Sequence, residues 1–256
     1  MTGRRTCVVL GARNVSRGLA RLAATVRARA GGPVDLFVAA GHGRGYGVNS
    51  RVWLRRLPSI LGCGLWEALD AGAAAPPAAL VTDVGNEILY GFAPEQVAAW
   101  ARESVLRLAD RGARVAITRL PLASIAGVGE IRLRLLRTLF VPGCRLGPAA
   151  LRDAAARLDD ALVALARETG AALLEQPGHW YGLDAIHVRR RRLDDLWAAA
   201  CDAWEWPRPT VPPRASFGEW AALGSRAAEV RSLARVTLVT PQPAYRGRAA
   251  LRVWLY

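Results

Sequence analysis

Residues 7–18 are the stretch that decides the fold, and they read CVVLGARNVSRG. The first five residues form a short, nearly continuous apolar run, which is typical of a strand buried on both faces. A glycine ends this run, and a polar segment of helical character follows it. Similar apolar runs rich in Val, Leu and Ile recur at 34–40, 79–85, 114–120 and 171–175.

Segments of helical length separate these runs, and the clearest are residues 94–111 and 147–169. The first has Pro94 near its start, where a missing N–H costs little, and Gly170 supplies a stop after the second. Strands that alternate with helices form βαβ units, in which both faces of a parallel sheet are covered. We therefore predict a flavodoxin-like three-layer α/β/α sandwich with a five-stranded parallel sheet.

The character of the chain changes after Trp206. A proline-rich connector, WPRPTVPPR, is followed by a short helical stretch and by two alternating runs at 235–240 and 250–256. These runs predict a small C-terminal β-hairpin or edge appendage. The expected division is one α/β domain over residues 1–205 and a connector with its appendage over 206–256.

Composition excludes several classes of function. The formal charge of +14 comes from Arg alone, since the chain has no Lys, and the arginines are spread over its whole length. Nucleic acid is therefore disfavoured as a partner, because binding it needs a continuous basic face. No apolar run reaches the ~18 residues that a membrane span needs. The N-terminal apolar run is too short for a signal peptide, so we expect a cytoplasmic protein without membrane contact.

Neither a metal nor a cofactor is expected. The four Cys and three His are scattered without metal-ligand spacing. The glycine-rich loop GHGRGYG, residues 41–47, lacks the lysine of a nucleotide-binding P-loop and does not follow the first strand.

Four polar segments follow the predicted strands, and in an open parallel sheet such segments meet at the carboxyl edge, where ligands bind. They read LGARNVSRG at 10–18, GHGRGYG at 41–47, TDVGNEILYG at 82–91 and WYGLDAIHV at 180–188. If the first and third strands are neighbours, the segments after Gly11 and Asp83 face one crevice. We expect His42, in the second segment, to border it at most.

In order and spacing these segments resemble the four sequence blocks of the SGNH (GDSL) hydrolases, over about residues 6–200. That family has a Gly-Asp-Ser block after the first strand, a glycine after the second, a Gly-x-Asn-Asp block after the third and an Asp-x-x-His block near the end. The matching positions here are Gly11–Asn14, Gly41 or Gly43, Gly85–Glu87 and Asp184–His187.

The resemblance implies a role for each surviving residue. Asp184 would orient His187 and stabilise its protonated form during base catalysis. The side-chain amide of Asn86 and a backbone N–H of Gly41 or Gly43 would stabilise an oxyanion, with Gly85 and Asn14 beside them. The alternative for the fourth block is an Asp184 that caps a helix and a His187 that merely lies on the surface.

Three positions depart from the family pattern. Arg13 stands where the family has its nucleophilic serine, Ala12 replaces the aspartate of the first block, and Glu87 replaces that of the third. A guanidinium has no lone pair to offer and stays protonated, so Arg13 cannot act as a nucleophile. Ser16 is the nearest hydroxyl; it is either a first-turn capping group or a displaced nucleophile.

Two functions follow from these observations. One is an ester or acyl hydrolase that uses Ser16 or another route to activate water on a small-molecule ester. The other is a non-catalytic relative that binds an anionic ligand through Arg13, because a guanidinium at a helix N-terminus favours negative charge. In a competing arrangement Arg13 pairs internally with Asp184 or Glu87 and fills the pocket.

Overall fold

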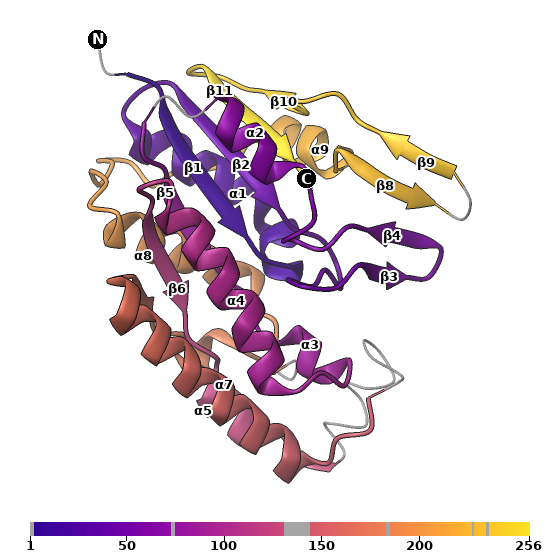
Figure 1. Ribbon diagram of the computed structural model, residues 1–256. Helices are drawn as coiled ribbons and strands as arrows, with labels where there is room; N and C mark the ends of the chain where they lie inside the picture. Colours follow the sequence, from indigo (N-terminus) through magenta and orange to yellow (C-terminus); the bar gives the residue numbers. More distant parts are fainter. Residues whose placement is uncertain (1–2, 73–74, 131–143, 183–184, 227, 234–235) are drawn as a thin grey trace.

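The computed structural model describes residues 3–72, 75–130, 144–182, 185–226, 228–233 and 236–256. Its centre is a seven-stranded sheet in the order β10-β11-β2-β1-β5-β6-β7 (Figure 1). The strands are β1 (Arg5–Leu10), β2 (Val34–Ala39), β5 (Ala78–Val81), β6 (Arg114–Thr118), β7 (Ala172–Leu174), β10 (Tyr245–Arg246) and β11 (Leu251–Leu255). All neighbouring strands are parallel except the pair β10–β11.

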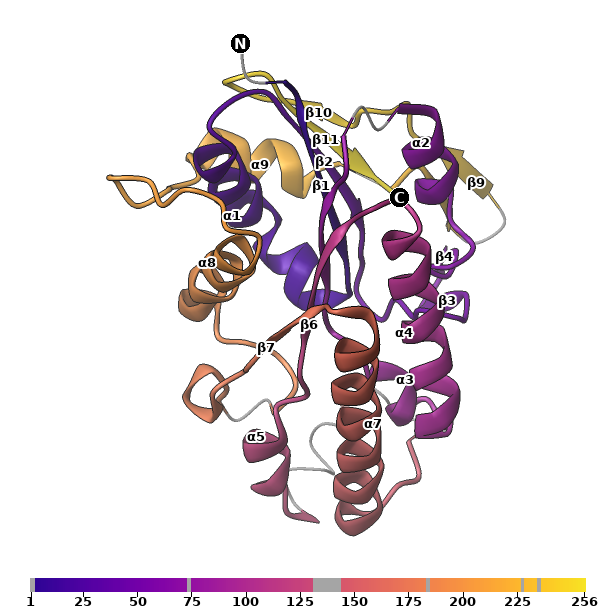
Figure 2. The ribbon, with the colours of Figure 1, turned by 60° about the vertical axis from the view of Figure 1, so that its left-hand side comes forward.

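Helices cover both faces of this sheet, as Figure 2 shows with the sheet nearly edge-on. One face carries α1 (Arg13–Ala30), α8 (Leu193–Ala203) and α9 (Phe217–Gly224). The other carries α2 (Leu65–Gly72), α4 (Pro94–Ala109) and α7 (Pro148–Thr169). The short helices α3 (Asn86–Leu89) and α5 (Leu122–Ala126) lie beyond the ends of β5 and β6.

The alternating directions of the side chains along β1 explain why a hydrophobic core lies on each face of the sheet. Val8 and Leu10 point into the core under α4 and α7, whereas Cys7 and Val9 point into the core under α1 and α8. Successive side chains of a strand face opposite sides of a sheet, so a strand between two layers must be apolar throughout. The continuous apolar run at 7–10 follows from this constraint.

The predicted three-layer α/β/α fold is confirmed. The five predicted strands correspond to β2, β1, β5, β6 and β7 in spatial order, and the first and third are neighbours, as the common crevice requires. The order reverses between β1 and β5, which is where a doubly wound sheet opens its ligand crevice.

The C-terminal tail differs from the expected hairpin. Its two alternating runs do not pair with each other: β9 (Val236–Val239) pairs with β8 (Val230–Leu233), whereas β11 joins the main sheet beside β2. Local alternation in the sequence shows that a run is extended but not which strand it pairs with. A domain boundary at 205/206 stays a prediction.

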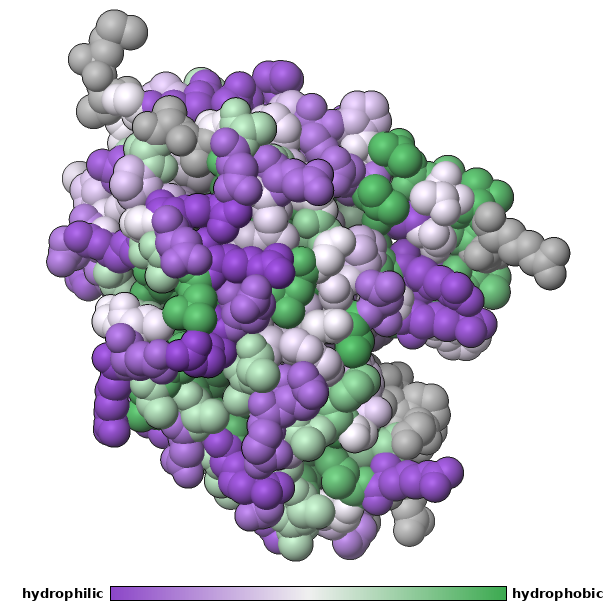
Figure 3. Space-filling view, in the orientation of Figure 1, coloured by the Kyte–Doolittle hydropathy of each residue, from purple (hydrophilic) through white to green (hydrophobic). Residues whose placement is uncertain are grey.

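A second, four-stranded antiparallel sheet projects from the main body in the order β3-β4-β8-β9. Its other strands are β3 (Ser50–Val52) and β4 (Arg55–Leu57), so it joins the segment after β2 to the C-terminal tail. Hydrophobic side chains are exposed over β8 and β9, at the upper right of Figure 3, and these are Val230, Leu233, Val236, Leu238 and Val239.

Within the described residues, no helix is both long enough and apolar enough to cross a bilayer.

Two tryptophans allow a matched test of this architecture. Trp197 on α8 is fully buried against Gly18 of α1, whereas Trp53 at the β3–β4 turn is 91% exposed. We expect Trp197→Ala to lower the free energy of unfolding by about 3–5 kcal/mol, because it leaves a large cavity. Trp53→Ala should change it by no more than about 0.5 kcal/mol. Urea denaturation followed by circular dichroism measures both, and equal effects would contradict this packing.

Candidate ligand site at the carboxyl edge of the sheet

The segments after β1, β2 and β5 and the segment around His187 converge on one crevice. A cavity of about 60 Å³ has Arg13, Asn86 and His187 in its wall, and an adjoining one of about 20 Å³ shares these three residues and adds His42 and Gly43. Figure 3 shows the surface hollowed just below the small sheet, on the side where these segments lie. Three of the four predicted blocks therefore meet at this crevice, together with His187 from the fourth block.

The carboxylate of Asp83 organises the start of α1. Ala12 stands at the N-cap of this helix and has no side-chain oxygen to accept the unpaired N–H groups of the first turn. Asp83, at the end of β5, accepts instead from the backbone N of Ala12 at 2.9 Å and of Asn14 at 3.0 Å. A carboxylate at a helix N-terminus is also favoured by the helix dipole. A neighbouring strand thus supplies the missing cap.

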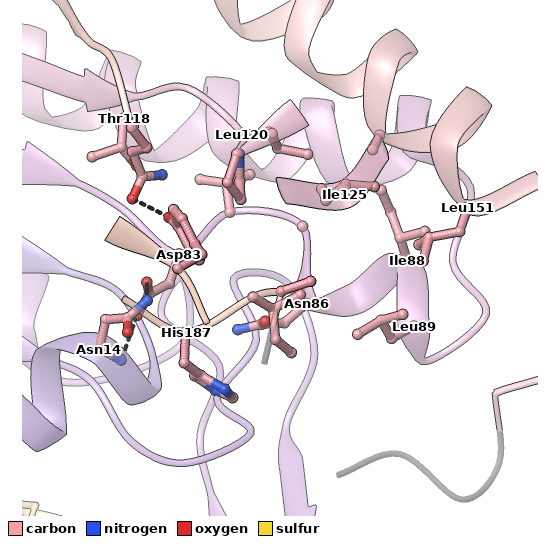
Figure 4. Close-up of a pocket in the computed structure, with 18 of the residues that line it drawn as sticks. Asn14, Asp83, Asn86, Ile88, Leu89, Thr118, Leu120, Ile125, Leu151 and His187 are labelled. Atoms are coloured by element: carbon pink, nitrogen blue, oxygen red, sulfur yellow. Dashed lines mark hydrogen bonds between the residues drawn. The ribbon is translucent and has the colours of Figure 1, made fainter. Parts of the chain in front are cut away.

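Asn14 extends this arrangement to the histidine segment. Its side-chain nitrogen donates to Asp83 at 2.7 Å, and its side-chain oxygen accepts from the backbone N of Val188 at 3.0 Å. Asn14 is buried, so these bonds replace contacts with water. Since Val188 follows His187 directly, Asn14 holds the backbone that carries the imidazole (Figure 4). Both ends of the Asn14 amide are engaged, which makes it a positioning residue.

Not all of the predicted oxyanion residues line the crevice. Asn86 and Gly43 line the smaller cavity together with His187, and Gly85 lines the larger one. Gly85 has a φ of +113°, which only glycine adopts readily, and this turn places Asn86 at the start of α3. Gly41 lies outside both cavities, and its carbonyl accepts from the backbone N of Arg44 at 3.2 Å.

Arg13 lies against His42. Its Nη1 is 3.0 Å from Nδ1 and 2.9 Å from Nε2 of that ring, and either nitrogen can accept the bond when the ring is neutral. Burial, followed by the charges of Arg13 and Arg55, lowers the pKa of His42 to about 4. His42 is therefore neutral at pH 7 and serves as an acceptor for the guanidinium.

Glu87 and Tyr46 fix the glycine-rich loop next to the crevice. Glu87 is fully buried, and its carboxylate accepts from the backbone N of Tyr46 in the glycine-rich loop. The Tyr46 hydroxyl lies 2.7 Å from the carbonyl of Thr82 and 3.1 Å from that of Leu10. Burial raises the pKa of the Glu87 carboxyl, although the Tyr46 N–H opposes this shift. Glu87 therefore fixes the loop and lines neither cavity of the crevice.

Ser16 lies away from the crevice. It is exposed on α1, its hydroxyl donates to the carbonyl of Arg13 at 3.1 Å, and it lines neither of the two cavities. This placement favours the first-turn interpretation of Ser16 over that of a displaced nucleophile. Asp184 lies outside the described residues, so its pairing with His187 stays a prediction.

Apolar side chains form the opposite end of the larger cavity. Figure 4 shows Asn86 and His187 at one end, with Ile88, Leu89, Ile125 and Leu151 at the other. Ile88 and Leu89 come from α3, Ile125 from α5 and Leu151 from the first turn of α7. The crevice thus has a polar end and an apolar end, as sites for small organic ligands commonly do.

No protein-family model matches the sequence, and no curated protein matches it. Solved structures do match in fold. The aryl esterase of M. smegmatis superposes with a TM-score of 0.56 at 11% identity, over 78% of this chain and 98% of the esterase. The chain has the SGNH-hydrolase fold. Est24, a carbohydrate acetylesterase from Sinorhizobium meliloti, gives a TM-score of 0.54 at 14% identity, again over 78% of this chain and 98% of that one. At such identities the likeness extends to the fold alone.

Sequence reasoning missed two residues of the site in this SGNH-type fold. The sequence places Asp83 only at the end of a strand, and no local signal marks it as the cap of a helix that begins at Arg13. His42 was expected to border the crevice at most, and its contact with Arg13 depends on how the second loop folds back. No spacing in the sequence relates residues 13 and 42.

The role of Asp83 can be tested by removing its carboxylate. Asp83→Ala leaves two backbone N–H groups and the Asn14 amide without their acceptor, so we expect a loss of about 3 kcal/mol in the free energy of unfolding. Asp160→Ala, on the exposed side of α7, should change it by no more than about 0.5 kcal/mol. Urea denaturation gives both values. A similar small effect for the two variants would refute the capping role.

The pKa of His42 predicts a stability change in acid. Its pKa of about 4 in the folded protein lies below the ordinary histidine value of 6.5, so between these pH values the unfolded chain binds the extra proton. The contribution of neutral His42 should be complete above pH 6.5 and decline as the pH falls towards 4. We expect the wild type to lose more stability between pH 7 and pH 4.5 than His42→Gln, which cannot titrate. Parallel losses would contradict a neutral His42.

Proposed function

We propose that the crevice binds a short organic carboxylate and that the protein does not hydrolyse esters through a serine. One observation carries this proposal: Arg13 lines both cavities of the crevice together with Asn86 and His187. The sequence resemblance assigns the nucleophile to this same position. A fixed cation at this point suits the negative product of ester cleavage better than it suits a neutral ester.

The polar end supplies the contacts for a carboxylate. A guanidinium carries its N–H donors in a planar fork that matches the two oxygens of a carboxylate. The side-chain amide of Asn86 adds a donor from α3. Donors fixed by the fold need little reorganisation when an anion arrives, which is why such sites are effective.

The apolar end of the crevice limits the size and polarity of the rest of the ligand. The larger cavity measures about 60 Å³, and its far wall consists of Val84, Ile88, Leu89, Leu120, Ile125, Val128, Leu151 and Ala155. Each buried methylene contributes about 0.8 kcal/mol, so a chain of a few carbons gains affinity there. A short fatty acid such as butyrate combines both requirements.

The described lining residues offer no activated nucleophile. They include no serine and no cysteine, and the hydroxyls are those of Thr118, Tyr181 and Tyr90. Thr118 donates to Thr82 and Tyr181 donates to Gln176. Burial raises the pKa of Tyr90 to about 12, so its phenolate is scarcely populated at neutral pH.

The second candidate function is that of a hydrolase without a serine nucleophile. The fold, and the placement of His187 beside Asn86, favour it. His187 would take a proton from a water molecule as the water oxygen attacks the acyl carbon, and Asn86 would stabilise the oxyanion.

Calorimetric titration with butyrate and with its neutral isostere butyramide tests the binding proposal. We expect butyrate to bind, and Arg13→Gln to weaken it roughly ten- to a hundredfold, the value of one charge-assisted contact. Arg56→Gln removes the same charge from an exposed face of the small sheet and should leave affinity unchanged. Equal binding of butyramide, or of butyrate by Arg13→Gln, would contradict the proposal.

Turnover of p-nitrophenyl butyrate separates the two candidates. The wild type should release p-nitrophenol no faster than His187→Gln, because no described side chain in the crevice can form an acyl-enzyme. Arg13→Ser restores a hydroxyl at the nucleophile position and should exceed both. Multiple turnovers by the wild type that His187→Gln abolishes would establish the hydrolase instead.

A further inference from the structure

A second cavity, of about 250 Å³, lies on the other side of His42. It opens between the small sheet, the end of α9 and the carboxyl ends of β2 and β11. His42 lines both this cavity and the smaller one of the crevice, so its ring forms a shared wall. Leu57, Leu223 and Leu255 contribute apolar surface to the new cavity.

Three arginines line this cavity, and they come from three different elements. Arg55 is on β4, Arg231 is on β8, and Arg226 follows α9. No Asp or Glu is among the described lining residues. Tyr256 also lines the cavity, and its backbone oxygen accepts a hydrogen bond from the buried Arg44. Three arginines therefore line a cavity whose described lining includes no acidic side chain.

The register of the small sheet places two of these arginines on one face. Arg55 pairs with Leu233, and Arg231 lies two residues before Leu233 on the same strand. Side chains two residues apart point to the same side, so Arg55 and Arg231 are diagonal neighbours across β4 and β8. Burial lowers the pKa of the half-buried Arg55, and the charge of Arg231 lowers it further. Two like charges are thus held near each other at partly buried positions.

Hydrogen bonds within the protein do not use up these donors. Nη2 of Arg55 donates to the carbonyl of His42 at 2.6 Å, which fixes the side chain at the cavity wall. The Nε of Arg231 is buried and has no hydrogen-bond partner among the described residues. Leaving a buried donor unpaired is costly, and each such group calls for a partner.

We propose that this second cavity binds a phosphate group, either as inorganic phosphate or as the phosphate of a small monoester. A phosphate dianion offsets the repulsion between Arg55 and Arg231 and offers oxygens in the geometry that a guanidinium fork matches. Its charge suits several arginines better than a single carboxylate does. The site is separate from the proposed carboxylate site, since it uses neither Arg13 nor Asn86.

Isothermal titration of the full chain with inorganic phosphate tests the site, at constant ionic strength because salt screens such contacts. We expect saturable binding that Arg231→Gln weakens by about tenfold or more, the effect of losing one charge-assisted contact. The matched control is Arg56→Gln, on the next residue of β4 and therefore on the opposite face of the same sheet. It should leave phosphate affinity within about twofold of the wild type.

Two further titrations make the test more specific. Arg13→Gln should retain phosphate binding, whereas it should lose butyrate binding, so the two sites can fail independently. Titration with phenyl phosphate distinguishes the sources: tighter binding than inorganic phosphate indicates a monoester, and weaker binding indicates the free ion. Absence of saturable phosphate binding by the wild type would overturn the proposal. Equal weakening by Arg231→Gln and Arg56→Gln would do the same, because it would reflect net charge alone.

Discussion

The carboxylate of Asp83 connects the three segments on which the crevice depends. It accepts from the backbone at the start of α1 and from the Asn14 side chain, and Asn14 in turn holds the backbone next to His187. One buried chain of hydrogen bonds therefore joins the end of β5, the first turn of α1 and the histidine segment. Charge-assisted bonds of this kind are stronger than neutral ones, and burial strengthens them further.

This frame holds whichever residue occupies position 13. The bonds from Asp83 reach the backbone of residues 12 and 14 and the side chain of Asn14, and none involves the side chain between them. The hydrogen bonds that shape the crevice therefore do not depend on the side chain of Arg13. That side chain instead affects the electrostatics, because a permanent cation lies against a neutral His42. The chemistry of the site depends on the side chain at position 13 rather than on the fold.

His42 lies between two arginines, Arg13 and Arg55. Its ring faces Arg13 on the crevice side, and its backbone carbonyl accepts from Arg55 on the side of the small sheet. Positive charge therefore reaches this loop from both directions. Because Arg55 and Arg231 belong to a sheet built partly from the C-terminal tail, the tail contributes to the electrostatics of a region far away in sequence.

The sequence by itself determined the layers of the fold. Strands covered on both faces are apolar at nearly every position, and residues 7–10 show this pattern directly. Residues 34–39 depart from it only at Asp35, whose carboxylate pairs with Arg4 and Arg252. It also indicated which segments meet at the carboxyl edge, since parallel strands end on the same side. The position of Arg13 at the start of the first helix followed from the same reasoning.

Only the tertiary structure decided how these segments contact one another. The capping of α1 by Asp83, the contact of Arg13 with His42 and the pairing of β11 with β2 join residues 29 to 217 positions apart. No local pattern encodes such pairs, because periodicity reports on which face of an element a residue lies and not on its partner. The convergence of Arg55 and Arg231 likewise depends on the register between β4 and β8, which long-range packing sets.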